Sequence, residues 1–149
     1  MFWEGRVLWG AMVRDNLLAL DWFAKLPIVD AKRIGMTGMS LGSTMTQWTA
    51  AFDERVKTMV SVANHNRYQD YIPTHAGGHA IYYFVPNILF EKIDMEAVNG
   101  LIAPRYQLVL FGDQDDLEPL VGIRKIEAWN KRVYGLYGRA DRNWRLQDD

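Results

Sequence analysis

Hydrophobic and polar positions alternate along the chain in two periods, one typical of helices and one typical of buried strands. In residues 5–26, apolar side chains such as Val7, Leu17 and Phe23 recur at helical spacing, and charged residues occupy most of the other face. Pro27 ends this helix. The same patterns predict strands over residues 33–37, 56–63, 106–111 and 133–137, and helices over residues 43–52, 95–101 and 118–131.

The order of these elements indicates the fold class. Helices and strands alternate, which is typical of an α/β fold with a mainly parallel sheet, here of about four strands. Parallel neighbours require right-handed crossovers, so we expect helices on both faces of the sheet. The chain is predicted to form a single domain over residues 1–149.

A polar region interrupts the alternation after the second strand. Residues 64–78 contain glycine and histidine and have the length of a functional loop, while residues 81–90 are aromatic. We therefore predict a lid or pocket region over residues 64–93, with His79, Tyr82 and Tyr83 as candidate pocket residues.

Composition supports a folded domain and excludes several functions. The chain has 149 residues, of which 49% are hydrophobic, and this content excludes a disordered protein. A net charge of −1 produces no long-range field to attract nucleic acid or an acidic membrane. The absence of cysteine excludes disulfides and thiolate chemistry. No apolar run reaches the roughly 18 residues of a spanning helix, and residues 1–4 do not resemble a signal peptide, so a cytoplasmic location is the default expectation.

The residues most suggestive of chemistry lie between the predicted strand 33–37 and helix 43–52. They read Gly38-Met39-Ser40-Leu41-Gly42, the Gly-x-Ser-x-Gly pattern of a nucleophile elbow. Such a turn exposes the serine hydroxyl, the glycines leave room where a Cβ would clash, and the next helix points its free amides at the reacting centre. We predict Ser40 as nucleophile and the Leu41 N–H as the first oxyanion donor.

Two other interpretations of this segment were weighed. An ordinary glycine-rich turn between strand and helix could produce the same letters, but the apolar strand before it and the amphipathic helix after it favour the elbow. A nucleotide-binding domain is excluded because the segment lacks the third glycine of a phosphate-binding loop and the later ribose-binding acid.

Residues 30–42 closely resemble the elbow region of α/β-hydrolases of the dienelactone-hydrolase and acetyl-xylan-esterase-like group. Similarity continues through residues 52–57, 67–70, 81–86 and 101–105 to Gly112-Asp113-Gln114-Asp115, and so covers most of the chain. The resemblance implies a partial α/β-hydrolase fold, shortened at both ends, and a carboxylic-ester hydrolase that needs no metal or other cofactor. It also implies a Ser–Asp–His triad in that chain order.

The resemblance places the triad acid at Asp115, which would orient the histidine and stabilise its protonated form. Asp113 and Asp116 are close rivals, because the sequence defines the loop but not which carboxylate points inward. A calcium loop built from Asp113, Asp115, Asp116 and Glu118 is disfavoured, since the glycine and terminal glutamate of such a loop are absent.

The triad histidine has no match at the expected position. The family places it in a Gly-His turn that would follow residues 134–141, whereas the three histidines of this chain, His65, His75 and His79, all precede Asp115. Gly77-Gly78 argues against a helical metal pair formed by His75 and His79. His65, directly after the strand 56–63, is the histidine best placed to line the pocket and serve as base.

The N-terminal side also differs from the family pattern, because nothing in residues 1–37 matches the loop that supplies the second oxyanion donor. Without further strands before the elbow strand, one edge of the sheet would lack a partner. We therefore predict a homo-oligomer, most simply a two-fold dimer joined along this edge.

The sequence thus predicts a serine esterase that acts on a small ester through an acyl-enzyme. The alternative is a catalytically weak or silent hydrolase-like module that oligomerises or binds a ligand.

Overall fold

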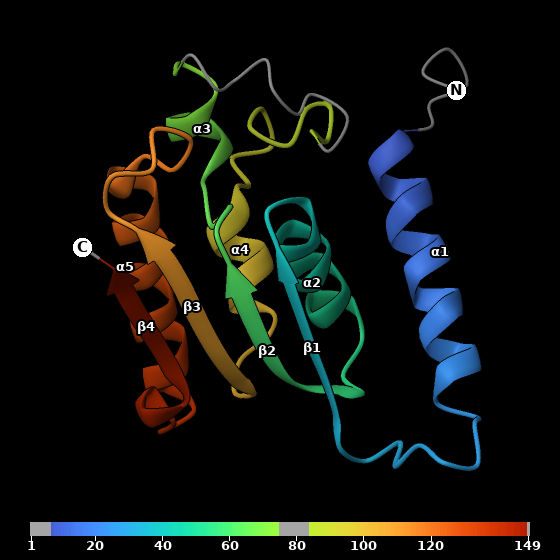
Figure 1. Cartoon of the computed structure of the whole chain (residues 1–149). Coiled ribbons are helices and arrows are strands. Elements are labelled where there is room, and N and C mark those ends of the chain that lie inside the picture. Colours follow the sequence, from blue (N-terminus) through green and yellow to red (C-terminus); the bar gives the residue numbers. More distant parts are fainter. Residues whose placement is uncertain (1–6, 75–83, 149) are drawn as a thin grey trace.

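Four parallel strands form one sheet, whose spatial order β1-β2-β3-β4 follows the chain (Figure 1). A computed structural model describes residues 7–74 and 84–148. The strands are β1 (Ile34–Met39), β2 (Val56–Val62), β3 (Tyr106–Gly112) and β4 (Asn143–Asp148). The helices are α1 (Leu8–Phe23), α2 (Leu41–Phe52), α3 (Tyr68–Tyr71), α4 (Met95–Gly100) and α5 (Leu120–Leu136). The predicted α/β class with a four-stranded parallel sheet is confirmed.

Within the described residues, α2, α4 and α5 lie along the same face of the sheet (Figure 1). The expectation of helices on both faces is therefore wrong for this part of the chain. The reason is topological: each strand is the spatial neighbour of the one before it, so every right-handed crossover returns over the same face. Helix α1 lies beyond the free edge of β1 and packs against α2.

The main hydrophobic core lies between these helices. Trp9 of α1 meets Trp48 of α2 edge to face, with ring centroids 6.4 Å apart. The cluster also contains Val13, Tyr68, Met95, Val98 and Ile126. Because α1, α2, α4 and α5 all contribute to it, the core fixes the elbow helix α2 against the rest of the domain.

The predicted strand over residues 133–137 is wrong, because residues 133–136 form the last turn of α5 and Tyr137 is its C-cap. Ile126, Asn130 and Tyr134 are each fully buried at a spacing of four, which is a helical period. The helix ends at Leu136, and Gly138, the residue after the C-cap, has a φ of +63°. The N–H of Arg139 returns to the Tyr134 carbonyl at 3.0 Å, as in a Schellman motif. The fourth strand follows this stop and occupies residues 143–148, for which no element was predicted.

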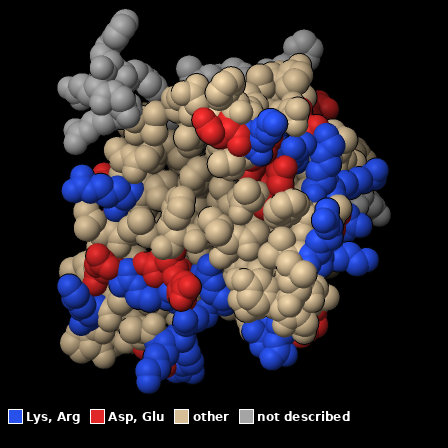
Figure 2. Space-filling model, turned by 180° about the vertical axis from the view of Figure 1, so that it is seen from behind, with Lys and Arg blue, Asp and Glu red and all other residues tan. Residues whose placement is uncertain are grey.

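The helical face of the molecule shows lysine and arginine intermixed with aspartate and glutamate, beside uncharged areas (Figure 2). None of the helices in the described ranges is long and apolar enough to cross a membrane.

Candidate active site

Ser40 occupies a sharp turn between the last residue of β1 and the first residue of α2. Its φ of 54° and ψ of −117° are unusual for a residue other than glycine. Its N–H donates to the Val62 carbonyl of β2 at 2.9 Å, and its carbonyl accepts from Thr44 of α2 at 3.2 Å. The neighbouring strand and the following helix therefore hold the turn, and the residue itself remains exposed.

The two glycines that flank Ser40 differ in whether the surrounding structure has room for a side chain. A Cβ on Gly38 would lie 2.2 Å from the Gly42 carbonyl oxygen, so no side chain fits there. A Cβ on Gly42 would meet nothing within 4 Å. The expectation that both glycines avoid a clash is thus correct for Gly38, while space alone does not require glycine at Gly42.

Leu41, the predicted oxyanion donor, is the first residue of α2. Its N–H therefore belongs to the first helical turn, whose amide groups have no acceptor within the helix. The helix dipole also places partial positive charge at this end, beside Ser40.

Backbone strain is concentrated around Ser40. Ala63 and Asn64, directly after β2, have φ values of 56° and 58°, and both residues line the same cavity as Ser40. Left-handed conformations of this kind cost about 1 kcal/mol or more for residues other than glycine and tend to cluster at functional sites. Three such residues around one cavity indicate a site whose shape is imposed by the surrounding fold.

A buried polar network holds the strained segment after β2. The Asn64 amide donates to Thr44 Oγ1 of α2 at 2.7 Å, and Gln47 Nε2 donates to the Asn64 carbonyl at 3.0 Å. Gln47 Nε2 also lies 3.2 Å from the hydroxyls of Ser43 and Ser61. Its Oε1 accepts from Asn99 of α4 at 3.0 Å. Gln47 thus ties the elbow helix, β2 and α4 to the loop beside Ser40.

The cavity at Ser40 has a volume of about 40 Å³ and is lined by Ser40, Ala63, Asn64, Tyr71, Asp115, Leu117 and Glu118. Asp115 lies in the turn after β3, and its Oδ1 accepts from the Leu117 N–H at 2.9 Å. Asp113 and Asp116 are not among the lining residues, and Asp116 is exposed. The structure therefore brings Asp115, rather than its two rivals, to the cavity that contains Ser40.

Glu118 is a second carboxyl group at this cavity, and it was not among the catalytic residues predicted from the sequence. Its Oε1 accepts from the His65 backbone N–H at 2.8 Å, and its exposure is 2%. Burial, with a smaller effect of the Asp115 charge, raises the pKa of Glu118 to about 7. In the sequence it stands at the start of a helix after an acidic run, where a glutamate normally faces solvent, so nothing in the pattern indicated that it turns inward.

The predicted histidines are placed differently from one another. His65 is 1% exposed, its ring is not part of the cavity lining, and burial lowers its pKa to about 4. No partner for its Nδ1 is found among the described residues. His75 and His79, together with the candidate pocket residues Tyr82 and Tyr83, lie outside the described residues. In the described ranges, no three His, Asp or Glu side chains are grouped to hold a metal ion.

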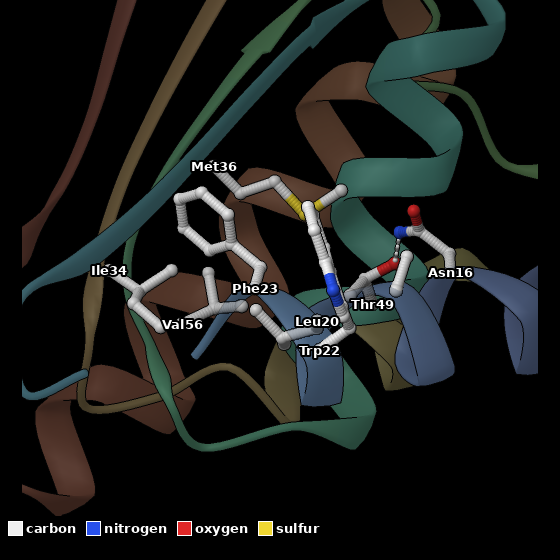
Figure 3. Close-up of a pocket in the computed structure, with 9 residues that line it drawn as sticks. Asn16, Leu20, Trp22, Phe23, Ile34, Met36, Thr49 and Val56 are labelled. Atoms are coloured by element: carbon white, nitrogen blue, oxygen red, sulfur yellow. Dashed lines mark hydrogen bonds between the residues drawn. The ribbon is translucent and has the colours of Figure 1, made fainter. Parts of the chain in front are cut away.

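A larger cavity of about 330 Å³ lies between α1, α2 and β1 (Figure 3), and Ser40 is not among its lining residues. Its lining is almost entirely apolar and includes Leu20, Trp22, Phe23, Ile34, Met36 and Val56. The side-chain amide of Asn16 donates a 2.7 Å hydrogen bond to Thr49 Oγ1 (Figure 3). With no titratable group in its lining, this cavity has no means of acid–base chemistry, and the smaller cavity at Ser40 is the candidate active site.

Sequence comparisons identify proteins that this chain resembles. The profile of the Prolyl oligopeptidase family matches residues 5–74, which include the elbow. The chain is 39% identical over 142 residues, or 95% of its length, to the "Putative hydrolase YtaP" of Bacillus subtilis (strain 168). That alignment covers 47% of the relative, so the chain spans about half the length of this curated relative.

Several solved structures with a similar fold are described as esterases. A carbohydrate esterase family 15 glucuronoyl esterase from Caldicellulosiruptor kristjansonii matches 92% of this chain with a TM-score of 0.71 and 19% identity, over 44% of its own chain. The glucuronoyl esterase from Solibacter usitatus matches 86% of this chain with a TM-score of 0.69 and 22% identity, over 36% of its own chain. The resemblance to α/β-hydrolases that the sequence predicted is confirmed.

Proposed function

Because this chain is an α/β-hydrolase, we propose that it acts as a serine hydrolase that cleaves carboxylic esters through an acyl-enzyme on Ser40. The observation that carries the proposal is the geometry of Ser40. It is exposed at a φ of 54° in the turn between β1 and α2, and it shares a cavity with Asp115. A nucleophilic serine needs this exposure, an acid in the same site and amides at the reacting centre.

In the proposed reaction, Ser40 Oγ attacks the ester carbonyl carbon and the negative charge moves onto the carbonyl oxygen. The Leu41 N–H stabilises that oxygen from the first turn of α2. Collapse of the intermediate expels the alcohol and leaves an ester on Ser40, which water then hydrolyses. Asp115 orients the group that carries the proton.

The sequence alone leaves the source of the base open between His65, His75, His79, another subunit, and a part of the protein beyond these 149 residues. The burial of His65, its lowered pKa and its absence from the cavity lining count against its ring as the base. The substrate is proposed to be a small ester, since the cavity at Ser40 measures about 40 Å³.

A fluorophosphonate probe tests the proposal, because it phosphonylates activated serines. We expect stoichiometric modification that maps to Ser40 and disappears in Ser40→Ala, together with hydrolysis of p-nitrophenyl acetate. Thr37→Ala is the matched control, since it removes an exposed hydroxyl from β1 three positions earlier. Labelling that persists in Ser40→Ala would contradict the proposed nucleophile.

The second candidate function is a hydrolase-like module without turnover. It is favoured by one observation, namely that none of the residues lining the cavity at Ser40 is a histidine. Such a module would retain the fold and a ligand-binding cavity, and its Ser40 would stay unmodified by the probe.

We also propose a two-fold dimer joined along β1. In the described part of the chain, β1 pairs with β2 alone and leaves its other edge free. A free edge of a parallel sheet is a template for pairing with another strand.

A further inference from the structure

One wall of the cavity at Ser40 is formed by an aromatic residue. Tyr71 of α3 is the largest of the described residues that line this cavity. It is almost fully buried, with an exposure of 3%. Because the cavity measures only about 40 Å³, the position of the Tyr71 ring affects how large a group Ser40 can carry.

An ionic network fixes α3, although this helix has only four residues. The buried Asp94 carboxylate accepts hydrogen bonds from the first two N–H groups of α3, at 2.8 and 3.0 Å. Arg67, the N-cap of α3, pairs with Glu96 of α4 at 2.7 Å and with Asp70 of α3 at 2.8 Å. Hydrogen bonds between charged groups are stronger than neutral ones. The network therefore holds Tyr71 in place.

A second and larger cavity lies next to α3. Its volume is about 190 Å³, and we call it the Phe84 cavity; its lining is mostly apolar and includes Tyr68, Ile72, Phe84, Ile88 and Leu89. The Phe84 ring packs edge to face against Tyr71, with ring centroids 6.2 Å apart. Tyr71 thus lines the cavity at Ser40 and contacts a ring that lines the other cavity. An apolar cavity of roughly 150 Å³ is enough to bind benzene, so the Phe84 cavity has room for an aryl or short alkyl group.

We propose that Tyr71 is a specificity-determining residue, which limits the acyl group on Ser40 to a short one and separates it from the Phe84 cavity. This inference rests on the proposed serine hydrolase function. An acyl group of acetyl size fits beside Ser40, whereas a longer chain meets the Tyr71 ring, which the ionic network prevents from moving aside. Without that ring, an alkyl chain on Ser40 can extend toward Phe84 and into the apolar cavity.

The rate of Ser40 labelling by fluorophosphonates of different length tests the inference, because the alkyl group on phosphorus takes the place of the acyl group. A methyl and a hexyl probe are compared in the wild-type chain, Tyr71→Phe and Tyr71→Ala. One methylene in an apolar pocket changes selectivity by roughly 10–200-fold, so Tyr71→Ala should raise the hexyl-to-methyl rate ratio by at least about tenfold. Tyr71→Phe is the matched control, since it keeps the ring and should keep the wild-type ratio.

The Phe84 cavity is tested by filling it. Leu89→Trp adds bulk to its lining, so Leu89→Trp combined with Tyr71→Ala should return the hexyl-to-methyl ratio toward the wild-type value. Leu89→Trp alone should leave the ratio unchanged, because Tyr71 still separates the two cavities. A double variant that keeps the full gain of Tyr71→Ala would overturn the Phe84 cavity as the place where the longer chain binds.

The outcomes separate this inference from the function on which it rests. A Tyr71→Ala protein that reacts with the methyl probe but keeps the wild-type ratio would overturn the role of Tyr71 while leaving Ser40 as nucleophile. A wild-type chain that reacts with neither probe would overturn both. Tyr71→Leu, which keeps an apolar side chain but removes the ring, gives the same readout should Tyr71→Ala fail to fold, and an unchanged ratio in Tyr71→Leu would then overturn the inference.

Discussion

The side chain of Glu118 accepts a 2.8 Å hydrogen bond from the backbone N–H of His65, and both residues are almost completely buried. The bond joins the loop just before α5 to the segment that follows β2, next to the cavity at Ser40. Burial shifts the pKa values of the two side chains in opposite directions. It raises the pKa of Glu118 to about 7 and lowers the pKa of His65 to about 4. Both shifts favour the uncharged form.

These two shifts predict an unusual pH dependence of stability. Between pH 4.5 and about 7 the folded chain keeps the Glu118 proton that the unfolded chain has lost, so Glu118 makes the free energy of unfolding fall as the pH rises. Between pH 6.5 and about 4 the unfolded chain protonates His65 and the folded chain does not, so His65 makes it fall as the pH drops. The two slopes, each up to about 1.4 kcal/mol per pH unit, should largely cancel between pH 4.5 and 6.5.

Glu118→Gln separates the two effects. Without the Glu118 titration, the free energy of unfolding should rise by roughly 2 kcal/mol from pH 4.5 to pH 6.5, where the wild type stays nearly level. Urea denaturation followed by tryptophan fluorescence at several pH values measures this. Parallel wild-type and Glu118→Gln curves would contradict the assigned pKa of Glu118.

Substitution of the two elbow glycines should give opposite results. Gly38→Ala places a Cβ 2.2 Å from the Gly42 carbonyl oxygen, so the turn must open. We expect the free energy of unfolding to fall by about 3 kcal/mol or more and the labelling of Ser40 to be lost. Gly42→Ala is the matched control, because its Cβ meets nothing and alanine favours a helix by up to about 1 kcal/mol. Thermal unfolding of the two variants provides the comparison, and equal melting temperatures would contradict the close contact at Gly38.

Gln47 does not line the cavity at Ser40, but we expect it to be essential to the shape of that cavity. Gln47→Leu removes the hydrogen bonds that Gln47 makes with the Asn64 carbonyl and the Asn99 amide, and the loss of each is expected to cost about 0.5–1.5 kcal/mol. The rate of Ser40 labelling should fall as well, because Asn64 lines the cavity and loses its support. Asn16→Ala, which breaks the single partly buried bond to Thr49, is the control and should cost about 1 kcal/mol without affecting labelling.

The elbow could be predicted from the sequence because its determinants are local. Ser40 lies between an apolar strand and an amphipathic helix, and Gly38 allows a close approach four residues along the same chain. The first three strands were found within one or two residues for a similar reason, since each is a short apolar run with clear ends.

The errors arose where local pattern and tertiary packing disagree. Val133 and Tyr134 have strand-like side chains, but α5 continues through them because Tyr134 packs inward in phase with Ile126 and Asn130. Glu118 was missed because its inward orientation depends on the His65 N–H, 53 positions earlier in the chain. No periodicity reports a hydrogen bond between loops that are so far apart in sequence.

The free edge of β1 leads to a prediction about the oligomeric state. The proposed dimer should show about twice the chain mass of 17.2 kDa by light scattering at micromolar concentration. Thr37→Lys adds a charge to the exposed side of this edge strand, and edge lysines are a common means of preventing strand pairing, so the dimer should weaken. Thr58→Lys is the matched control, since it adds the same charge to an exposed position of β2, which has a neighbour on each side. A monomeric wild type would contradict the proposal directly. Equal weakening by both substitutions would instead place the interface on the face of the sheet, because Thr58 lies away from the free edge.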